Sequence, residues 1–106
     1  MKSIISTKKE CYICRRFLGL STTYGLEKHH FIHGRGLRKL ADEDGLFAEI
    51  CSRHHRNLHD DPLHPYDQEL KAIAERSYIK KKISEGYTEG QARGMFLNRY
   101  GKHFDY

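Results

Sequence analysis

Two short motifs in this sequence have the spacing of a zinc site. Cys11 and Cys14 are separated by two residues, and so are Cys51 and His54. Zinc takes four tetrahedral nitrogen and sulfur ligands, and a site filled by four protein ligands is structural rather than catalytic. Because residues 15–50 lie between the motifs, one shared ion would close that segment and stabilise the fold. We therefore predict a structural zinc ion held by Cys11, Cys14, Cys51 and His54.

Histidines gather in the middle of the chain, and two of them have the spacing of a second metal site. Four residues turn an α-helix by about 400°, so His55 and His59 share one face if residues 52–60 are helical and can chelate one divalent ion. His54 lies about 140° out of phase with His59. We therefore assign His54, rather than its neighbour His55, to zinc.

The adjacent histidines His29 and His30 fall on a predicted strand, where neighbouring side chains point to opposite sides. We expect them to have different roles. One imidazole can bind the second metal ion while the other acts as a general base, because the histidine pKa lies close to working pH. A metal that stabilises charge on a phosphate and a base that deprotonates water together suit hydrolysis of a phosphodiester bond.

The hydrophobic pattern predicts the elements that must position these residues. Two strands and a short helix carry the histidines and the second zinc motif, and two longer helices follow. The last helix begins at a capping box formed by Thr88 and Gln91. The predicted strands cover residues 26–32 and 46–50, and the predicted helices cover residues 52–60, 66–84 and 88–100.

The remaining segments are expected to hold little regular structure. Residues 15–25 contain glycines and a Ser-Thr-Thr run and read as a loop. Residues 37–45 are polar, and we expect at most one helical turn there. A short strand is predicted at residues 3–7.

The composition is that of a small globular domain with a basic N-terminal half. A length of 106 residues favours one domain, residues 1–106, with a core at 11–60 and a helical extension at 66–104. The formal net charge is +5, and residues 1–45 carry nine Lys and Arg against five Asp and Glu, which suits a nucleic-acid partner. No apolar stretch is long enough to span a membrane. Residues 1–10 also lack the apolar run of a signal peptide, so we expect a cytoplasmic protein with no membrane partner. Three cysteines, an odd number, argue against a disulfide framework.

These motifs, in this order, resemble those of the HNH endonucleases, especially small phage and prophage members. In that family a cysteine pair precedes a strand ending in Asp-His or His-His, then a second strand, then a Cys-x2-Cys/His motif that leads into a helix with metal-binding histidines. The matching pieces here are Cys11/Cys14, His29-His30, residues 47–50 and Cys51-x2-His54-His55-x3-His59. The resemblance spans half the chain and implies an α+β fold: a zinc-stabilised treble-clef (ββα-metal) core with two additional C-terminal helices.

The same resemblance implies a role for each histidine. His29 would bind the catalytic metal with His55 and His59, and His30 would be the general base. The implied cofactors are structural Zn²⁺ and a second divalent ion, which is Mg²⁺, Mn²⁺, Ni²⁺ or Zn²⁺. The implied activity is metal-dependent endonuclease hydrolysis of DNA, with RNA as the alternative substrate. Phage or host replication and recombination proteins are the partners this implies.

Basic side chains near these motifs are candidate phosphate contacts, which position nucleic acid without reading its sequence. They are Arg35, Arg38, Lys39, Arg53 and Arg56. Two further histidines, His33 and His64, have no role in this scheme and are expected at the surface.

One position departs from the family pattern. The family has an Asn five residues before Cys51, where it holds the loop after the base, and that position is Leu46 here. Asp42 or Asp44 is a candidate replacement, whereas Asn57 lies within a predicted helix and is not. A chain that had lost activity with this Asn would be a non-catalytic zinc-stabilised module that binds DNA or protein. The four histidines favour the enzyme, since a binding module has no need of them.

Overall fold

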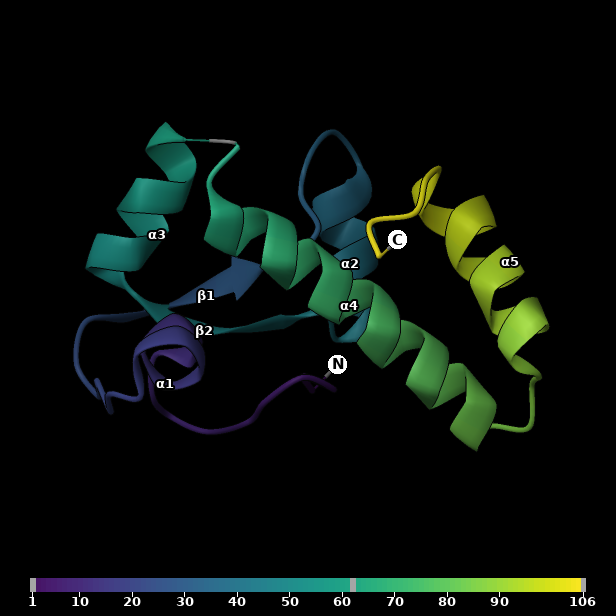
Figure 1. Ribbon diagram of the computed structural model, residues 1–106, viewed down its shortest axis with the longest axis horizontal. Helices are drawn as coiled ribbons and strands as arrows, with labels where there is room; N and C mark the ends of the chain where they lie inside the picture. Colours follow the sequence, from purple (N-terminus) through teal and green to yellow (C-terminus); the bar gives the residue numbers. More distant parts are fainter. Residues whose placement is uncertain (1, 62, 106) are drawn as a thin grey trace.

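The computed structural model describes residues 2–61 and 63–105, and in these ranges it has an α+β fold with two strands and five helices (Figure 1). In chain order the elements are α1 (Tyr12–Leu18), β1 (Leu26–His30), α2 (Leu37–Asp44), β2 (Phe47–Cys51), α3 (Ser52–Asp60), α4 (Pro65–Ser84) and α5 (Glu89–Tyr100). The α+β class and the two C-terminal helices are as predicted. Within the described ranges no helix has the length and apolar character needed to cross a membrane.

Strands β1 and β2 form an antiparallel pair in which the adjacent histidines lie at the opposite end from Cys51 of the second zinc motif. Leu26 pairs with Cys51 at one end, and His30 pairs with Phe47 at the other. Strand β1 ends two residues earlier than predicted, because the chain turns into the core and Phe31 is fully buried. Both histidines therefore lie at the end of β1, where the ring of His29 is 5.2 Å from that of His55 on α3, and His30 contacts Asp42 of α2.

Two segments that were predicted as loops are helical. Helix α1 begins at Cys11, whose thiol accepts a hydrogen bond from the backbone N–H of Cys14 at 3.3 Å. It ends at Gly19, whose φ of 66° is a conformation that favours glycine. Helix α2 packs its apolar residues Leu37 and Ala41, four residues apart, against the core. Residues 37–45 were expected to hold at most one helical turn because most of them are polar. That prediction was wrong because Leu37 and Ala41 have the spacing of one helix face despite the charged residues between them.

The strand predicted at residues 3–7 is absent from the described part of the chain. The Ser3 hydroxyl accepts a hydrogen bond from the backbone N–H of Ile5 at 3.0 Å, which bends the segment into a turn. The N–H of Ile4 donates to the carbonyl of Gly45 at 2.9 Å. The N-terminal arm therefore crosses the end of α2 instead of joining the sheet.

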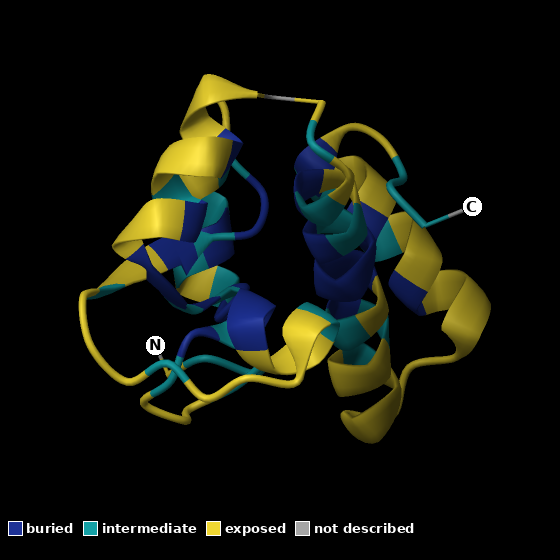
Figure 2. Ribbon diagram, turned by 60° about the vertical axis from the view of Figure 1, so that its left-hand side comes forward, coloured by how far each residue is buried: buried dark blue, intermediate teal, exposed yellow. Residues whose placement is uncertain are grey.

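Helices α4 and α5 pack against each other through aromatic side chains, and buried residues line the faces that α4 and α5 turn inward (Figure 2). The ring of Tyr78 lies 5.4 Å from that of Phe96 and 6.2 Å from that of Tyr100, centroid to centroid. Phe104 packs against the same cluster. Tyr78, Phe96 and Tyr100 are buried, and Phe104 is partly buried beside them. The predicted capping box begins α5.

Charged contacts join α5 to α2. One carboxylate oxygen of Asp44 accepts hydrogen bonds from Arg99 Nε at 2.5 Å and from the Tyr100 hydroxyl at 2.6 Å. Burial, reinforced by Asp44, raises the pKa of Tyr100, and the hydrogen bond to Asp44 raises the pKa of Arg99. Asp44 therefore holds α5 in place, and of the two carboxylates considered as replacements for an Asn at position 46 only Asp42 is not engaged by α5.

Candidate metal centres

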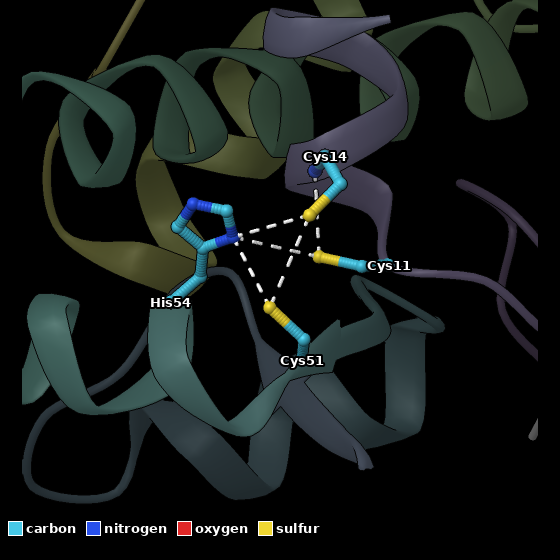
Figure 3. A group of neighbouring side chains, drawn as sticks. All are labelled: Cys11, Cys14, Cys51 and His54. Carbon is cyan, nitrogen blue, oxygen red and sulfur yellow. Dashed lines mark hydrogen bonds between the residues drawn. The ribbon is translucent and has the colours of Figure 1, made fainter. Parts of the chain in front are cut away.

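The four predicted zinc ligands come together where α1, β2 and α3 meet (Figure 3). All four are buried, and one ligand atom from each lies within 4.8 Å of the others. His54 Nδ1 lies 3.2, 3.5 and 3.7 Å from the sulfurs of Cys51, Cys14 and Cys11, and the sulfurs of Cys14 and Cys51 are 4.0 Å apart. A tetrahedral zinc ion sets sulfur–nitrogen pairs about 3.5 Å and sulfur–sulfur pairs about 3.8 Å apart. The group therefore fits a structural metal such as zinc.

His54, not His55, is the fourth member of this group. Burial, helped by the positive charge of Arg53, lowers the pKa of His54 and keeps its ring neutral, which is the form that binds a metal. His55 Nδ1 instead contacts a carboxylate oxygen of Glu27 at 3.2 Å. The two adjacent histidines of α3 thus face different surroundings, as the helical geometry predicted.

A cavity of about 470 Å³ opens beside β1 and α3, and histidines dominate its walls. Strand β1, the loop after it, α2 and α3 all contribute side chains. They are Lys28, His29, His30, His33, Arg38, His55, Leu58 and His59. All four histidines predicted for the reactive site therefore line one cavity.

His29 is the most enclosed histidine of this cavity. Its side chain is 7% exposed, and among the described residues its Nε2 atom has no hydrogen-bond partner. Burial, followed by the neighbouring His55 and His33, lowers the pKa of His29 to about 3. A buried ring nitrogen with no partner is costly unless something binds it, and a neutral imidazole can offer that nitrogen as a lone pair. A metal ion would satisfy it.

His55 and His59 face the same cavity from α3. The ring of His55 lies 5.2 Å from that of His29 and 6.1 Å from that of His59, centroid to centroid. Two imidazoles on one tetrahedral ion have centroids about 5 Å apart. The first spacing matches, and the second is wider. In the described part of the chain only the cysteine group has three or more ligand atoms that all lie within 4.8 Å of one another. The ligand atoms of His29, His55 and His59 line the same cavity but do not all lie within that distance of one another.

His30 points toward α2, away from His29. Its Nε2 atom lies 2.9 Å from Oδ1 of Asp42, and Lys28 Nζ lies 2.7 Å from the same oxygen. Hydrogen bonds from Lys28 and His30 lower the pKa of Asp42 to about 2. A carboxylate only accepts, so the His30 ring carries its hydrogen on Nε2 and its lone pair on Nδ1.

The basic residues predicted to contact phosphates are all exposed, but they do not all lie at the cavity. Arg38 lines it, and Arg56 lines the neighbouring surface beside His55 and His59. The other three lie on the surrounding surface of the loop, α2 and α3. They are Arg35, Lys39 and Arg53.

Both histidines that were expected at the surface have partners. His33 lines the cavity, and its Nε2 atom lies 3.1 Å from Oδ1 of the buried Asp67. His64 is the N-cap of α4, where its Nδ1 accepts a hydrogen bond from the N–H of Tyr66 at 3.1 Å. Both side chains are partly exposed, in keeping with the surface positions expected for them, but their contacts were not predicted.

Three residues around the cavity were not predicted from the sequence: Glu27, Lys28 and Asp67. Glu27 and His29 are two residues apart on β1, so strand alternation puts both on the face toward α3. The same alternation pairs Lys28 with His30 on the other face. Glu27 and Lys28 could therefore have been predicted from strand alternation. Asp67 could not, because its place beside His33 depends on how α4 packs.

Comparisons with protein-family models, with curated proteins and with solved structures gave no match to this chain.

Proposed function

We propose that this protein is a metal-dependent endonuclease of the HNH type, whose zinc-stabilised treble-clef (ββα-metal) core hydrolyses phosphodiester bonds in DNA. The observation that carries the proposal is the cavity in which an unpartnered buried His29, the paired His30 and the α3 histidines meet two cationic side chains. That combination supplies metal ligands, a base and phosphate contacts within one space.

The donors fit a second divalent ion, held by His29, His55 and His59. Neutral imidazole nitrogen is a good ligand for Zn²⁺, Ni²⁺ and related ions. Glu27 accepts the Nδ1–H of His55 and so leaves Nε2 of that ring for the metal, the usual carboxylate–histidine support of a metal site. When bound, the ion supplies Lewis-acid stabilisation of the charge that develops on the phosphate.

His30 is the general base of this proposal. Its Nδ1 lone pair takes a proton from water as the water oxygen attacks phosphorus and the bond to the leaving oxygen breaks. Asp42 fixes the tautomer and orientation of the ring and stabilises the imidazolium that forms. This is the support that the family obtains from other side chains, and it compensates for the fully buried Leu46 at the Asn position.

Nucleic acid is the proposed substrate because the cavity presents cations to a polyanion. Lys28 and Arg38 line it, and Arg56 lies on the adjoining surface. Such contacts bind the phosphate backbone without regard to base sequence. They suit DNA, with RNA as the alternative, and the delivering partners would be phage or host replication and recombination proteins.

The alternative function is a non-catalytic zinc-stabilised module that binds DNA or protein. The observation in its favour is that His29, His55 and His59 are not drawn into a closed ligand set within the described residues. A module of this kind needs the cysteine centre and the basic surface but no reactive metal.

Incubation of the zinc-loaded protein with supercoiled plasmid separates the two functions. Parallel reactions contain Mg²⁺, Mn²⁺, Ni²⁺ or EDTA, and single-stranded DNA, branched DNA and RNA are tested as further substrates. The enzyme requires nicking that depends on the added metal. Binding of plasmid with no cleavage under any metal, on any of these substrates, would support the binding module.

A further inference from the structure

The strongest unassigned feature is the pair formed by His33 and Asp67. His33 lies in the loop after β1 and lines the histidine cavity, whereas Asp67 lies in the first turn of α4. Their contact is 3.1 Å, from His33 Nε2 to Asp67 Oδ1. It therefore joins the C-terminal helical extension to the cavity wall.

Asp67 is buried as a charged group. Its side chain is 1% exposed, and Lys71 Nζ lies 3.1 Å from its second oxygen. Burial alone would raise the pKa of Asp67, but the polar contacts with His33 and Lys71 together lower it. Within the described residues Oδ2 has no hydrogen-bond partner, so Lys71 compensates the buried charge as an ion pair while His33 donates the hydrogen bond to Oδ1.

The contact leaves one nitrogen of His33 for another role. A carboxylate only accepts, so the hydrogen lies on Nε2 of His33, and the ring's lone pair is on Nδ1. The ring of His33 lies 6.0 Å from that of His29, centroid to centroid, about 1 Å wider than the spacing of two imidazoles on one ion, so the His33 ring must move toward His29 when the metal binds. A carboxylate that receives a histidine N–H is the support found behind metal-binding histidines.

We propose that His33 is a fourth histidine ligand of the cavity metal, positioned by Asp67 of α4, in a site where the ion takes five or six ligands and so keeps a position open for phosphate or water. This inference rests on the metal site of the proposed function and adds to it a ligand that comes from outside the predicted set. It also gives the C-terminal extension a part in the site: α4 supplies the carboxylate that fixes the ring.

The test is a metal titration that needs no cleavage activity. Zinc-loaded protein, with one zinc per chain verified before and after, is titrated with Ni²⁺ by calorimetry. The variants are His33→Asn, Asp67→Asn and the matched control His64→Asn, which replaces a histidine outside the cavity by a residue that also caps helices well. We expect Ni²⁺ affinity to fall at least about tenfold in His33→Asn and by about tenfold in Asp67→Asn, with His64→Asn unchanged.

A second measurement uses wild-type protein alone, so it stands even if a variant fails to fold. Histidine-ring NMR spectra are recorded before and after a second equivalent of Zn²⁺ is added, and Nδ1 of His33 is expected to shift on coordination. If His33→Asn binds Ni²⁺ as tightly as His64→Asn, or if the His33 ring signals do not move, the inference is overturned while the nuclease proposal stands. If wild-type protein binds no second ion, both are overturned.

Discussion

The Nε2 atom of His30 lies 2.9 Å from Oδ1 of Asp42, which links the end of β1 to α2. This contact fixes the ring hydrogen on one nitrogen and directs the lone pair of the other away from the carboxylate. Lys28 holds the same oxygen at 2.7 Å, so the carboxylate is itself oriented. The pair has the arrangement that a general base needs.

Replacing Asp42 by Asn tests whether this contact positions the base. Asn keeps the shape but loses the charge and can present its amide to the ring, which disfavours the reactive tautomer. We expect the plasmid-nicking rate to fall by roughly tenfold or more, with metal affinity unchanged. Glu43→Gln is the control, because Glu43 is on the same helix and contacts Arg99 instead. Equal nicking rates in the two variants would remove Asp42 from the site.

Removal of the structural metal is expected to unfold the protein. Structural zinc sites contribute on the order of 10–16 kcal/mol of apparent binding free energy, as much as the whole stability of a typical domain. Cys14→Ser or prolonged chelation should therefore abolish the cooperative thermal transition seen by circular dichroism. His64→Asn, which alters a histidine outside both centres and keeps a residue suited to the N-cap of α4, should retain zinc and the transition. A chelated protein that melts like the zinc-loaded one would show that the cysteine group is not a structural site.

The contact of Tyr100 with Asp44 makes stability depend on alkaline pH. Burial and Asp44 raise the pKa of Tyr100 above its ordinary value of 10.0. The unfolded chain then loses its proton at a lower pH than the folded chain, so this contribution is complete below about pH 10 and is lost as pH rises beyond it.

The variant Tyr100→Phe isolates this effect. It removes the hydroxyl from a 2.6 Å hydrogen bond to a charged acceptor, and we expect the free energy of unfolding in urea to fall by about 1–3 kcal/mol near pH 8. Between about pH 9 and pH 11 the wild-type midpoint should then decline more steeply than that of the variant. Parallel declines would show that Tyr100 ionises equally in both states.

Arg38 is expected to contribute one phosphate contact. Arg38→Ala should weaken plasmid binding about equally for unrelated sequences and reduce the salt dependence of binding by about one unit of slope. Binding is measured by fluorescence anisotropy over a range of salt concentrations. Arg93→Ala, an exposed arginine on α5 away from the cavity, is the control. An unchanged slope in Arg38→Ala would place the nucleic acid elsewhere.

The parts of the fold that short-range spacing determines were predictable from sequence. The zinc group follows from two Cys-x2-Cys/His spacings, and the shared face of His55 and His59 follows from helical geometry. Helices α1 and α2 were missed because short helices depend on capping and packing, such as the thiol of Cys11 at the start of α1.

The contacts that were missed join segments far apart in the chain. His33 contacts Asp67 only because α4 packs beside the loop after β1. Asp44 binds Arg99 only because α5 lies against α2. Neither pairing leaves a periodic signal in the sequence. Asp42, in contrast, was one of two candidates, and the position of α5 is what distinguishes it from Asp44.

The most direct test of the account is the comparison of wild-type protein with His30→Ala in a plasmid-nicking assay. Both proteins carry one zinc per chain, show the same thermal transition and receive the same added metal, and His64→Asn serves as the matched histidine control. The account predicts metal-dependent nicking by wild type and His64→Asn and a loss of about a hundredfold or more in His30→Ala, the scale of a general base. Equal nicking by wild type and His30→Ala, or none by either with every metal and substrate, would contradict it.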